Sequence, residues 1–387
     1  MRSIRLSEAA RIYSGNSINE RVKAQNYMGL NEGTPYIATK DISYGFLVNY
    51  ENGVKIPHSK SAEFKLAKKG SVLLCAEGGS AGRKMAIIDR DVFFVNKLFC
   101  FECDAQLNSR YLFYYLQTSI FQDLVKNSIT GIIGGVSLEK VRNLPMILPS
   151  LEKQREIVEK LDKAFAEIDL LERNFELSEE NANELLQSIM NFHFSSGDQI
   201  SGLDHPSAIP GNVMKLEKLT SIQTGKIDVN KAIEGGKYPF FTCSRDVYEI
   251  NDAPFEGKAV LVAGNGDLNV KYYEGKFNAY QRTYFLFVND ENELIPKYLY
   301  WFLESYVDQL RSESIGSTIK YIKMGNLTNA EIPLPSLSKQ LAIVEKLDSA
   351  FAEIERLKAQ IKFEKDYAIA LRQSLLSSAF SQEKVVA

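Results

Sequence analysis

The chain has 387 residues, of which 45% are hydrophobic and 25% charged, and its 46 lysine and arginine residues nearly balance 49 aspartate and glutamate residues. This composition excludes a disordered chain, a collagen-like chain and a uniformly basic protein. Four cysteines and three histidines do not indicate a disulfide framework, so we expect a reducing compartment. The sequence lacks the run of roughly 18 apolar residues that spans a membrane, and it does not begin like a signal peptide. We therefore expect a soluble, cytoplasmic protein of two or three domains.

Residues 1–148 have the pattern of a mixed α and β domain. Short β-rich runs are separated by turns rich in glycine, asparagine and aspartate, and these runs are Ser71–Ala76, Met85–Ile88 and Leu98–Phe101. A helix is expected over Ser109–Gln117, with its tyrosines in the core. The glycine-rich segment Gly78–Lys84 predicts a turn that ends in two basic residues.

A long helix is predicted to follow, over residues 149–196. Apolar and small residues recur there at alternating spacings of four and three, which is the period of a coiled-coil seam. Pro149 stops the preceding strand, and Ser150 is suited to cap the helix. An ordinary amphipathic helix that lies on a core is the alternative interpretation. The seam residues are Ile157, Leu161, Ile168, Leu171 and Leu185.

The remaining chain repeats this order. Residues 197–212, which are rich in glycine, serine and proline, are expected to be a linker. Residues 213–334 have the pattern of a second mixed domain, with strands over Ala259–Ala263 and Tyr284–Val288 and a helix over Pro296–Glu304. Residues 335–387 predict a second long helix, whose seam residues are Ile343, Leu347, Ile354, Leu357 and Leu371.

The two helical segments begin with nearly the same sequence. PSLEKQREIVEKLDKAFAEI from Pro149 and PSLSKQLAIVEKLDSAFAEI from Pro335 are identical at 16 of 20 positions, with an offset of 186 residues. Weaker similarities at nearly the same offset occur within the domains, for example between Arg110–Leu116 and Lys297–Leu303. The chain is therefore a tandem duplication of a domain followed by a helix.

Two seams of equal length can pair with each other. Parallel helices would require the chain to return along a full helix length, for which the linker is too short. We therefore predict an antiparallel coiled coil about 60 Å long, from about 40 residues at 1.5 Å each. The predicted fold class is α+β: two mixed α/β domains at opposite ends of two long helices, related by a pseudo-twofold axis.

Charge is unevenly distributed along the chain. Residues 1–148 carry 19 basic and 13 acidic residues, a net charge of +6. Residues 149–194 have a net charge of −6, and residues 213–334 have a net charge of −2. A basic first domain is typical of nucleic-acid contact, whereas the second domain has no such excess.

Several loops carry side chains that can contact DNA. Arginine, asparagine and glutamine bind base edges with paired hydrogen bonds, and lysine neutralises phosphate. Ordinary solvated loops are the alternative interpretation. The candidates are Thr39, Lys40, Ser80, Arg83 and Lys84 in the first domain and Lys226, Arg245, Asn265, Lys271, Gln281, Arg282, Lys320 and Lys323 in the second.

The sequence does not show a catalytic or metal-binding set. None of its Gly-Lys pairs is followed by the serine or threonine of a phosphate-binding loop, and the segment Gly264–Gly266 lacks the third glycine of a dinucleotide fingerprint. A D-P-P-Y-like tetrapeptide for adenine methylation is also absent. Cys100 and Cys103 are predicted to point to opposite faces of a strand, so we expect no metal site. We expect a non-catalytic chain without a cofactor of its own.

Two unlike domains, each followed by a helix that opens PSLxKQxxIVEKLDxAFAEI, resemble the specificity subunit of a type I restriction-modification system. The resemblance covers essentially the whole chain and includes the run IKYIKMGNL before the second helix. Pro210 matches a proline that the family often has before the second domain, but the tryptophan that often accompanies it is missing.

The resemblance implies two target recognition domains that each read one half of a bipartite sequence in double-stranded DNA. It also implies spacer helices that dock two methyltransferase subunits, and further restriction and translocase subunits in the complex. S-adenosylmethionine, ATP and Mg would then belong to these partners. Two other functions stay open from the residues alone: a coiled-coil adaptor that binds only proteins, and a self-contained DNA methyltransferase or nuclease.

Overall fold

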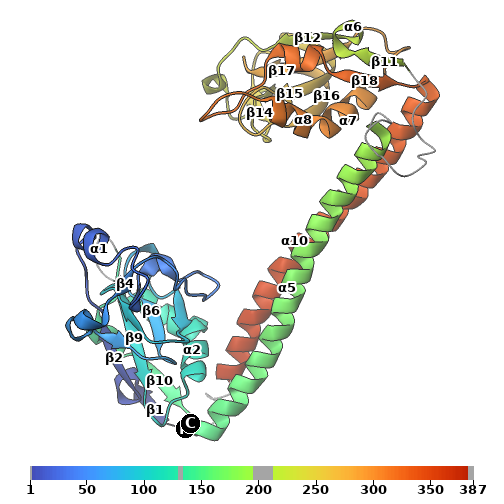
Figure 1. Cartoon of the computed structure of the whole chain (residues 1–387). Helices are drawn as coiled ribbons and strands as arrows, with labels where there is room; N and C mark the ends of the chain where they lie inside the picture. Colours follow the sequence, from blue (N-terminus) through green and yellow to red (C-terminus); the bar gives the residue numbers. More distant parts are fainter. Residues whose placement is uncertain (1, 130–133, 195–211, 382–387) are drawn as a thin grey trace, which may run out of the picture. The chain divides into compact units, whose positions relative to one another are not determined.

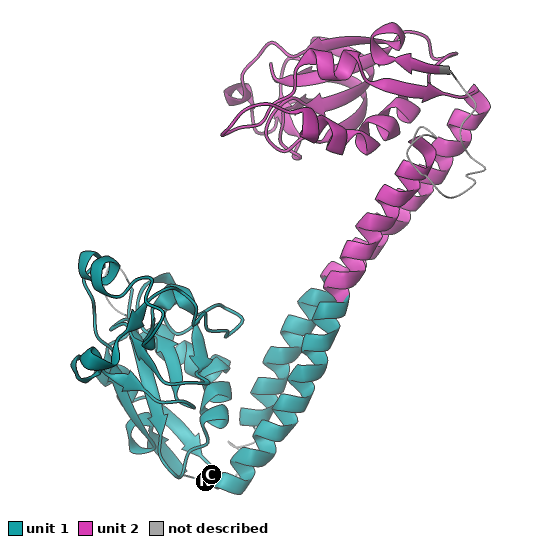
Figure 2. Cartoon of the chain, in the orientation of Figure 1, with its two compact units in different colours: residues 1–174, 363–387 teal, residues 175–362 magenta. Residues whose placement is uncertain are grey.

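The structure is a computed structural model that describes residues 2–129, 134–194 and 212–381. It divides into two compact units, one of residues 1–174 and 363–387 and the other of residues 175–362 (Figure 2). Each unit contains one mixed α/β domain and a segment of each of two long helices (Figure 1). The linker predicted over residues 197–212 lies, apart from Asn212, outside the described residues.

The described part of the first domain has two four-stranded sheets and a two-stranded ladder. One sheet has the order β2-β9-β6-β7 and is antiparallel, whereas the other has the order β4-β3-β8-β5 and contains a parallel pair, β3 with β8. The strands are β1 Arg2–Arg5, β2 Ala10–Ser14, β3 Thr34–Ile37, β4 Lys55–Ile56, β5 Leu66–Ala67, β6 Val72–Cys75, β7 Met85–Ile87, β8 Val92–Phe94, β9 Leu98–Cys103 and β10 Pro145–Leu148. The helices are α1 Glu20–Asn26, α2 Ser109–Gln117, α3 Ser119–Ser128 and α4 Leu138–Arg142.

The second domain differs in its sheet. Its described residues form one six-stranded sheet of order β12-β17-β15-β16-β13-β14, together with a two-stranded ladder. The strands are β11 Asn212–Lys215, β12 Thr220–Thr224, β13 Tyr238–Phe241, β14 Tyr248–Ile250, β15 Phe255–Ala263, β16 Val270–Ala279, β17 Thr283–Val288 and β18 Glu331–Leu334. The helices are α6 Leu216–Leu219, α7 Pro296–Ser305, α8 Val307–Glu313 and α9 Met324–Thr328.

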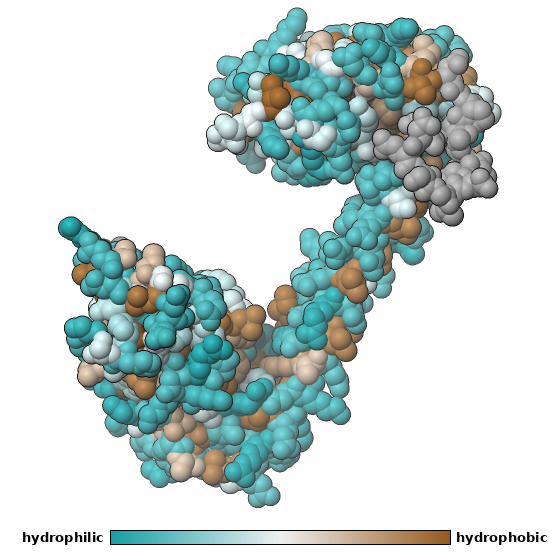
Figure 3. Space-filling view, in the orientation of Figure 1, coloured by the Kyte–Doolittle hydropathy of each residue, from teal (hydrophilic) through white to brown (hydrophobic). Residues whose placement is uncertain are grey.

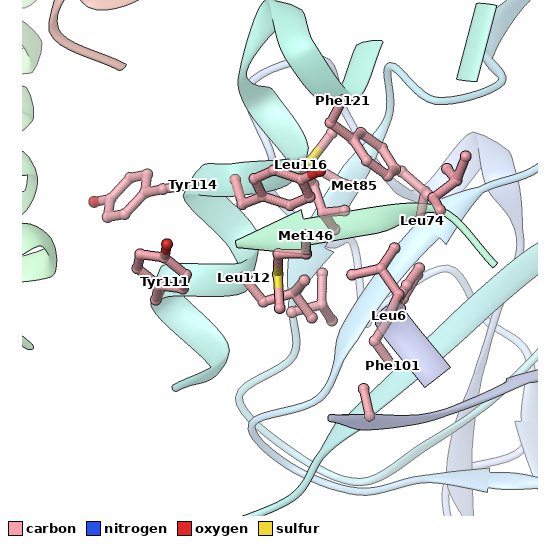
Figure 4. Close-up of a cluster of buried hydrophobic side chains, with 14 of the residues drawn as sticks. Leu6, Leu74, Met85, Phe101, Tyr111, Leu112, Tyr114, Leu116, Phe121 and Met146 are labelled. Atoms are coloured by element: carbon pink, nitrogen blue, oxygen red, sulfur yellow. The ribbon is translucent and has the colours of Figure 1, made fainter. Parts of the chain in front are cut away.

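The helix α2 joins the first sheet to the long helices. Asn108 caps it, because the Asn108 side-chain oxygen accepts hydrogen bonds from the backbone N–H groups of Arg110 and Tyr111, at 2.8 and 3.2 Å. Leu112 packs among sheet residues, and Tyr111 and Tyr114 point to the other side (Figure 4). The predicted core position of these aromatic residues is confirmed, since the buried ones are Tyr111, Tyr114 and Tyr115 in α2 and Tyr298 and Trp301 in α7, with Tyr300 half-buried.

The internal repeat extends to the strands that enclose each domain. The first and last strands pair antiparallel in both domains, β1 with β10 and β11 with β18. Each last strand leads into a long helix, α5 Leu151–Phe194 or α10 Leu337–Ser381. The Ser150 hydroxyl accepts a hydrogen bond from Lys153 N at 3.3 Å, as an N-cap does, whereas the Ser336 hydroxyl lies 3.1 Å from that of Ser338.

A buried glutamine attaches each domain to the start of its long helix. Gln154 is 0% exposed, and its Oε1 accepts from Asn108 N at 2.8 Å while its Nε2 donates to the carbonyl oxygens of Gln106 and Pro149, both at 2.9 Å. Gln340, 186 residues later, makes the same three bonds with Ile295 N, Glu293 O and Pro335 O, at 2.9, 2.9 and 3.0 Å. We call Gln154 and Gln340 the glutamine clamps.

A carboxylate about two turns further along each helix repeats the attachment. Asp162 accepts hydrogen bonds from Tyr114 and, at 2.6 Å, from Arg110. Asp348 accepts from Lys297 Nζ at 2.5 Å and from Trp301 Nε1 at 3.0 Å. The side chains differ but the positions correspond, so both domains are fixed to their helices in the same way.

The long helices pair antiparallel in both units (Figure 1). In the first unit, Leu161 and Ile168 of α5 share a hydrophobic core with Leu376 and Phe380 near the end of α10. In the second unit, the end of α5 shares a core with the start of α10, through Met190, Phe194, Ile343, Val344 and Leu347. The predicted α+β class and the antiparallel pairing of the two long helices are therefore confirmed within each unit.

The predicted seam is wrong at three of its ten residues. Ile157, Leu161, Ile168, Ile343, Leu347 and Ile354 are buried and Leu371 is half-buried, but Leu171, Leu185 and Leu357 are exposed. An α-helix has 3.6 residues per turn, so a stripe of period 3.5 drifts away from a straight partner. Leu185 and Leu357 instead line an open groove of about 500 Å³ in the second unit, beside the small residues Ser178 and Ala182.

Candidate nucleic-acid interface

Four of the five candidates in the first domain lie around Tyr44. The guanidinium carbon of Arg83 and the Nζ of Lys84 lie 5.5 and 5.0 Å from the centre of the Tyr44 ring. The Tyr44 hydroxyl is 3.0 Å from Ser80 Oγ, and Lys84 Nζ donates to Thr39 O at 3.5 Å. We call Thr39, Tyr44, Ser80, Arg83 and Lys84 the Tyr44 cluster. Sequence reasoning missed Tyr44, because an aromatic residue in a polar loop does not reveal its neighbours.

The turn Gly78–Lys84 positions the two cations. It follows the buried strand β6, and Arg83 donates a hydrogen bond to Gly79 O. Gly82 has a φ of 75°, and the side chain of Gln122 holds its carbonyl with a bond of 2.7 Å. Glycine is the residue that adopts this conformation without strain. The turn is therefore fixed to α3 and presents Arg83 beside Tyr44.

The cations in and beside this cluster are not held in ion pairs. Within residues 2–129 and the other described segments, Lys40, Arg83 and Lys84 form no ion pair with a carboxylate. Arg83 and Lys40 are exposed, and Lys40 lies on the 3₁₀ turn Thr39–Asp41 next to the cluster. Unpaired cations on a basic domain attract a polyanion.

In the second domain, backbone hydrogen bonds join the loops that carry most of the candidates. Gly264 N donates to Arg282 O and Gly266 N donates to Lys320 O, both at 2.9 Å, and Gln281 N donates to Ile227 O at 3.0 Å. The four loops therefore meet at one end of the sheet. They carry Lys226, Asn265, Gln281, Arg282 and Lys320, and Lys323 follows at the start of α9.

Two further candidates are engaged within the second domain. Arg245 Nε forms an ion pair with Asp267 at 2.7 Å, and Asp267 also contacts Arg311 at 3.4 Å. Lys271 is half-buried and donates to Ser244 O at 2.7 Å and to Asn269 Oδ1. Burial lowers the pKa of Lys271. These two side chains hold loops together, whereas the exposed Arg282 is free of such contacts through its side chain in the described structure.

A buried carboxylate lies near these loops. Among the described residues, Glu304 Oε2 is the one buried side-chain oxygen or nitrogen atom without a hydrogen-bond partner. Burial raises the pKa of Glu304, and the charges of Arg245, Arg311 and Lys271 oppose that rise. Sequence patterns do not reveal this group, because Glu304 lies at the end of a helix, where a glutamate is ordinarily solvated.

We expect Glu304→Gln to stabilise the protein at pH 8 by about 1 kcal/mol, because it removes the cost of burying an ionised carboxylate. A raised pKa means that the folded state binds the proton more tightly than the unfolded state does. This contribution to stability is full below the unfolded pKa near 4.5 and is lost as pH rises through the folded pKa. The gain should therefore shrink as pH falls from 8 to 5 in chemical denaturation. Glu234→Gln, at an exposed position, is the control; an equal gain in both variants would contradict this expectation.

Cys100 and Cys103 of the first domain pack separately, whereas Cys75 shares the buried cluster of Cys100. Cys100 belongs to one buried cluster and Cys103 packs against another, and burial raises the pKa of each thiol to about 11. In the described segments, histidine, cysteine, aspartate and glutamate side chains do not gather in groups of three or more that could hold a metal ion. Those segments also contain no helix with the length and apolarity needed to span a membrane.

Comparison with known proteins identifies the family. Residues 2–177 and 211–364 each match the model of the type I restriction modification DNA specificity domain. The chain is 42% identical over 171 residues to the type I restriction enzyme EcoDI specificity subunit of Escherichia coli, an alignment that covers 44% of this chain and 38% of that protein. It is 33% identical over 93 residues to the StySPI specificity subunit of Salmonella potsdam, covering 24% and 20%. Both alignments thus span less than half of the relative.

Two solved structures share the fold. A chain from a study of complex assembly and conformational transition of the type I R-M system superposes with a TM-score of 0.78 at 17% identity, covering 98% of this chain and 97% of that one. The HsdS subunit from Thermoanaerobacter tengcongensis superposes with a TM-score of 0.56 at 19% identity, covering 98% and 96%. With the family model matched in both halves, the chain belongs to the family of type I restriction-modification DNA specificity proteins.

Proposed function

We propose that the chain is the DNA-recognition subunit of a type I restriction-modification complex. Its two domains, residues 1–148 and 213–334, each read one half of a bipartite target in double-stranded DNA. The duplicated attachment carries this proposal, because two domains with different sheets are held by the same buried contacts on helices that begin with nearly the same sequence. Two readers of different sequences need this combination: the supports stay alike and the base-reading surfaces differ.

The helices, residues 149–196 and 335–387, would dock two methyltransferase subunits. Exposed apolar side chains on both helices support this part of the proposal (Figure 3), among them Leu171, Leu177, Leu185, Leu357 and Phe363. Large apolar side chains that lie in the open along a helix are typical of a surface that binds a partner. Restriction and translocase subunits would join the same complex, in the cytoplasm.

The chain would contribute recognition and no catalysis. S-adenosylmethionine would bind to the methyltransferase subunits, and ATP and Mg would bind to the restriction and translocase subunits. An adaptor that binds only proteins would not need the unpaired cations of the Tyr44 cluster. A self-contained metal-dependent nuclease would need a group of metal ligands, and the described residues do not bring together three or more histidine, cysteine, aspartate or glutamate side chains that could hold a metal ion.

Methylation mapping in a host that carries the chain with its methyltransferase subunit tests the proposal. We expect adenine methylation at one bipartite motif, with an unread gap between the two halves. The motif should vanish when the gene for this chain is deleted and the methyltransferase gene is kept. Unchanged methylation after the deletion would exclude the proposed function.

We expect Arg83→Ala to weaken discrimination at one half-site and Arg282→Ala at the other, each by about 1–3 kcal/mol if the arginine binds a base edge. The readout is the rate of methylation by the assembled complex on targets that carry single substitutions in either half. Lys69→Ala, an exposed lysine outside the Tyr44 cluster, is the control. An equal loss on both halves from either arginine variant would contradict two separate readers.

A further inference from the structure

The loop Ser43–Leu47 of the first domain places an apolar side chain in solvent. Leu47 is 73% exposed, more than any other large hydrophobic residue that the structure describes, and Tyr44 is 56% exposed. Neither residue was among the sequence-based candidates. An isolated exposed leucine needs no explanation in general, but the structure of this loop gives the exposure of Leu47 a specific cause.

The loop is closed by hydrogen bonds and has a strained backbone. Ser43 N donates to Leu47 O at 2.9 Å, and Leu47 N donates to Ser43 Oγ at 3.1 Å. Phe46 has a φ of 64° and is the one non-glycine residue with positive φ in the described chain. Its ring packs edge-on against Phe113 of α2, with ring centres 5.4 Å apart. Residues other than glycine rarely adopt a positive φ. Where they do, the residue often belongs to a ligand-binding element.

The base of the loop is also fixed. Asp41 is buried, and its Oδ2 accepts hydrogen bonds from Ala38 N at 2.8 Å and from Asn52 Nδ2 at 2.7 Å. The carbonyl oxygen of Asp41 accepts from Asn49 N at 2.8 Å. With both ends held and Phe46 turned inward, the backbone directs Leu47 outward, so its exposure is imposed by the fold.

The surroundings of the loop specify the class of ligand. Arg83 and Lys84 lie against the Tyr44 ring, and these cations are not paired with carboxylates in the described segments. A ligand at this surface must combine negative charge with apolar faces that a leucine can contact. Duplex DNA does so, since its phosphates surround stacked bases, and several DNA-binding proteins insert apolar side chains between base steps.

We propose that Leu47 enters a base step within or beside the half-site read by the first domain, while Lys84 binds a flanking phosphate and Arg83 reaches a neighbouring base edge. The proposal rests on the proposed function and assigns to Leu47 a role in opening the stack. A wedge of this kind favours steps that unstack easily, so Leu47 would add sequence preference without hydrogen bonds to bases.

The test uses the full complex with its methyltransferase subunits and a duplex that contains the mapped target. 2-Aminopurine replaces single bases in and beside the first half-site, except at the methylated adenine, because that base is itself expected to leave the stack. We expect a fluorescence rise at one step with the native chain and with Leu47→Met, and none with Leu47→Ala. Leu47→Ala should also weaken binding roughly tenfold, whereas Met28→Ala, at another exposed apolar residue of the domain, should not.

The outcomes separate the two proposals. Specific binding without any 2-aminopurine signal would overturn the wedge and leave the recognition function in place. A signal that persists in Leu47→Ala would also overturn it, as would loss of a methyltransferase subunit from the Leu47→Ala complex, which would make the loop a protein interface. Absence of specific DNA binding by the native complex would overturn the recognition function itself.

Discussion

Leu347→Asp should lower the free energy of unfolding of the second unit by at least about 3 kcal/mol, because it places a carboxylate in a closed apolar site. Leu347 is 0% exposed and belongs to the core that the start of α10 shares with α7 and the end of α5. The loss has two parts: the leucine side chain no longer fills its site, and the aspartate must be buried or force the helices apart.

The chain provides its own probe for this change. Its single tryptophan, Trp301, is 1% exposed in α7, with its ring 5.6 Å from that of Phe351 on α10. Tryptophan fluorescence during urea unfolding therefore reports the contact between the second domain and α10. The matched control is Leu341→Asp on the same helix, where the leucine is 51% exposed and the change should cost no more than about 0.5 kcal/mol.

The same substitution should disturb assembly with the methyltransferase subunits, because the pairing of α10 with α5 shapes the surface on which they would dock. Leu161→Asp should act in the same way on the first unit, where Leu161 is 3% exposed. Equal midpoints for Leu347→Asp and Leu341→Asp would show that Leu347 does not pack as described.

The predictable parts of the fold are those that follow from the local spacing of apolar residues or from the internal sequence repeat. The strand predicted over Leu98–Phe101 is the start of β9, and the helix predicted over Ser109–Gln117 is α2. The strands β4 and β5, at two residues each, gave no signal because they are held by distant partners. The arrangement of strands into two sheets in the first domain and one in the second could not be predicted either, since the same short runs can pair in either way.

In the candidate site, too, some residues could be predicted from the sequence and others could not. The basic turn Gly78–Lys84 was recognisable, because glycines followed by cations after an apolar run are visible in sequence. Tyr44 and Leu47 were not, since their significance comes from Arg83 and Lys84 some 40 residues away and from the backbone angle of Phe46. Periodicity also overstated the seam at Leu171, because a heptad pattern identifies a face but not how far the partner covers it.

Gln340→Ala should lower the free energy of unfolding of the second unit by about 2–4 kcal/mol, although Gln340 is a polar residue. The substitution removes three hydrogen bonds and leaves Ile295 N, Glu293 O and Pro335 O without their partner in a region where Gln340 is 0% exposed. A buried backbone group that loses its hydrogen-bond partner destabilises the fold by its full desolvation penalty. The Trp301 transition should therefore shift to lower urea concentration, while Lys339→Ala, at the exposed neighbouring residue, should leave it in place.

Gln154→Ala, the same change in the first unit, provides the second control. It should destabilise the first domain and leave the Trp301 transition unchanged, because the bonds of Gln154 lie within the first unit. In the assembled complex we compare targets that are altered in one half-site or in the other. We expect each variant to slow methylation more on targets altered in the half-site that its own domain reads. If Gln340→Ala and Lys339→Ala unfold at the same urea concentration, the clamp does not hold the second domain. The duplicated attachment would then lose its role as the support that lets two unlike domains act on one target.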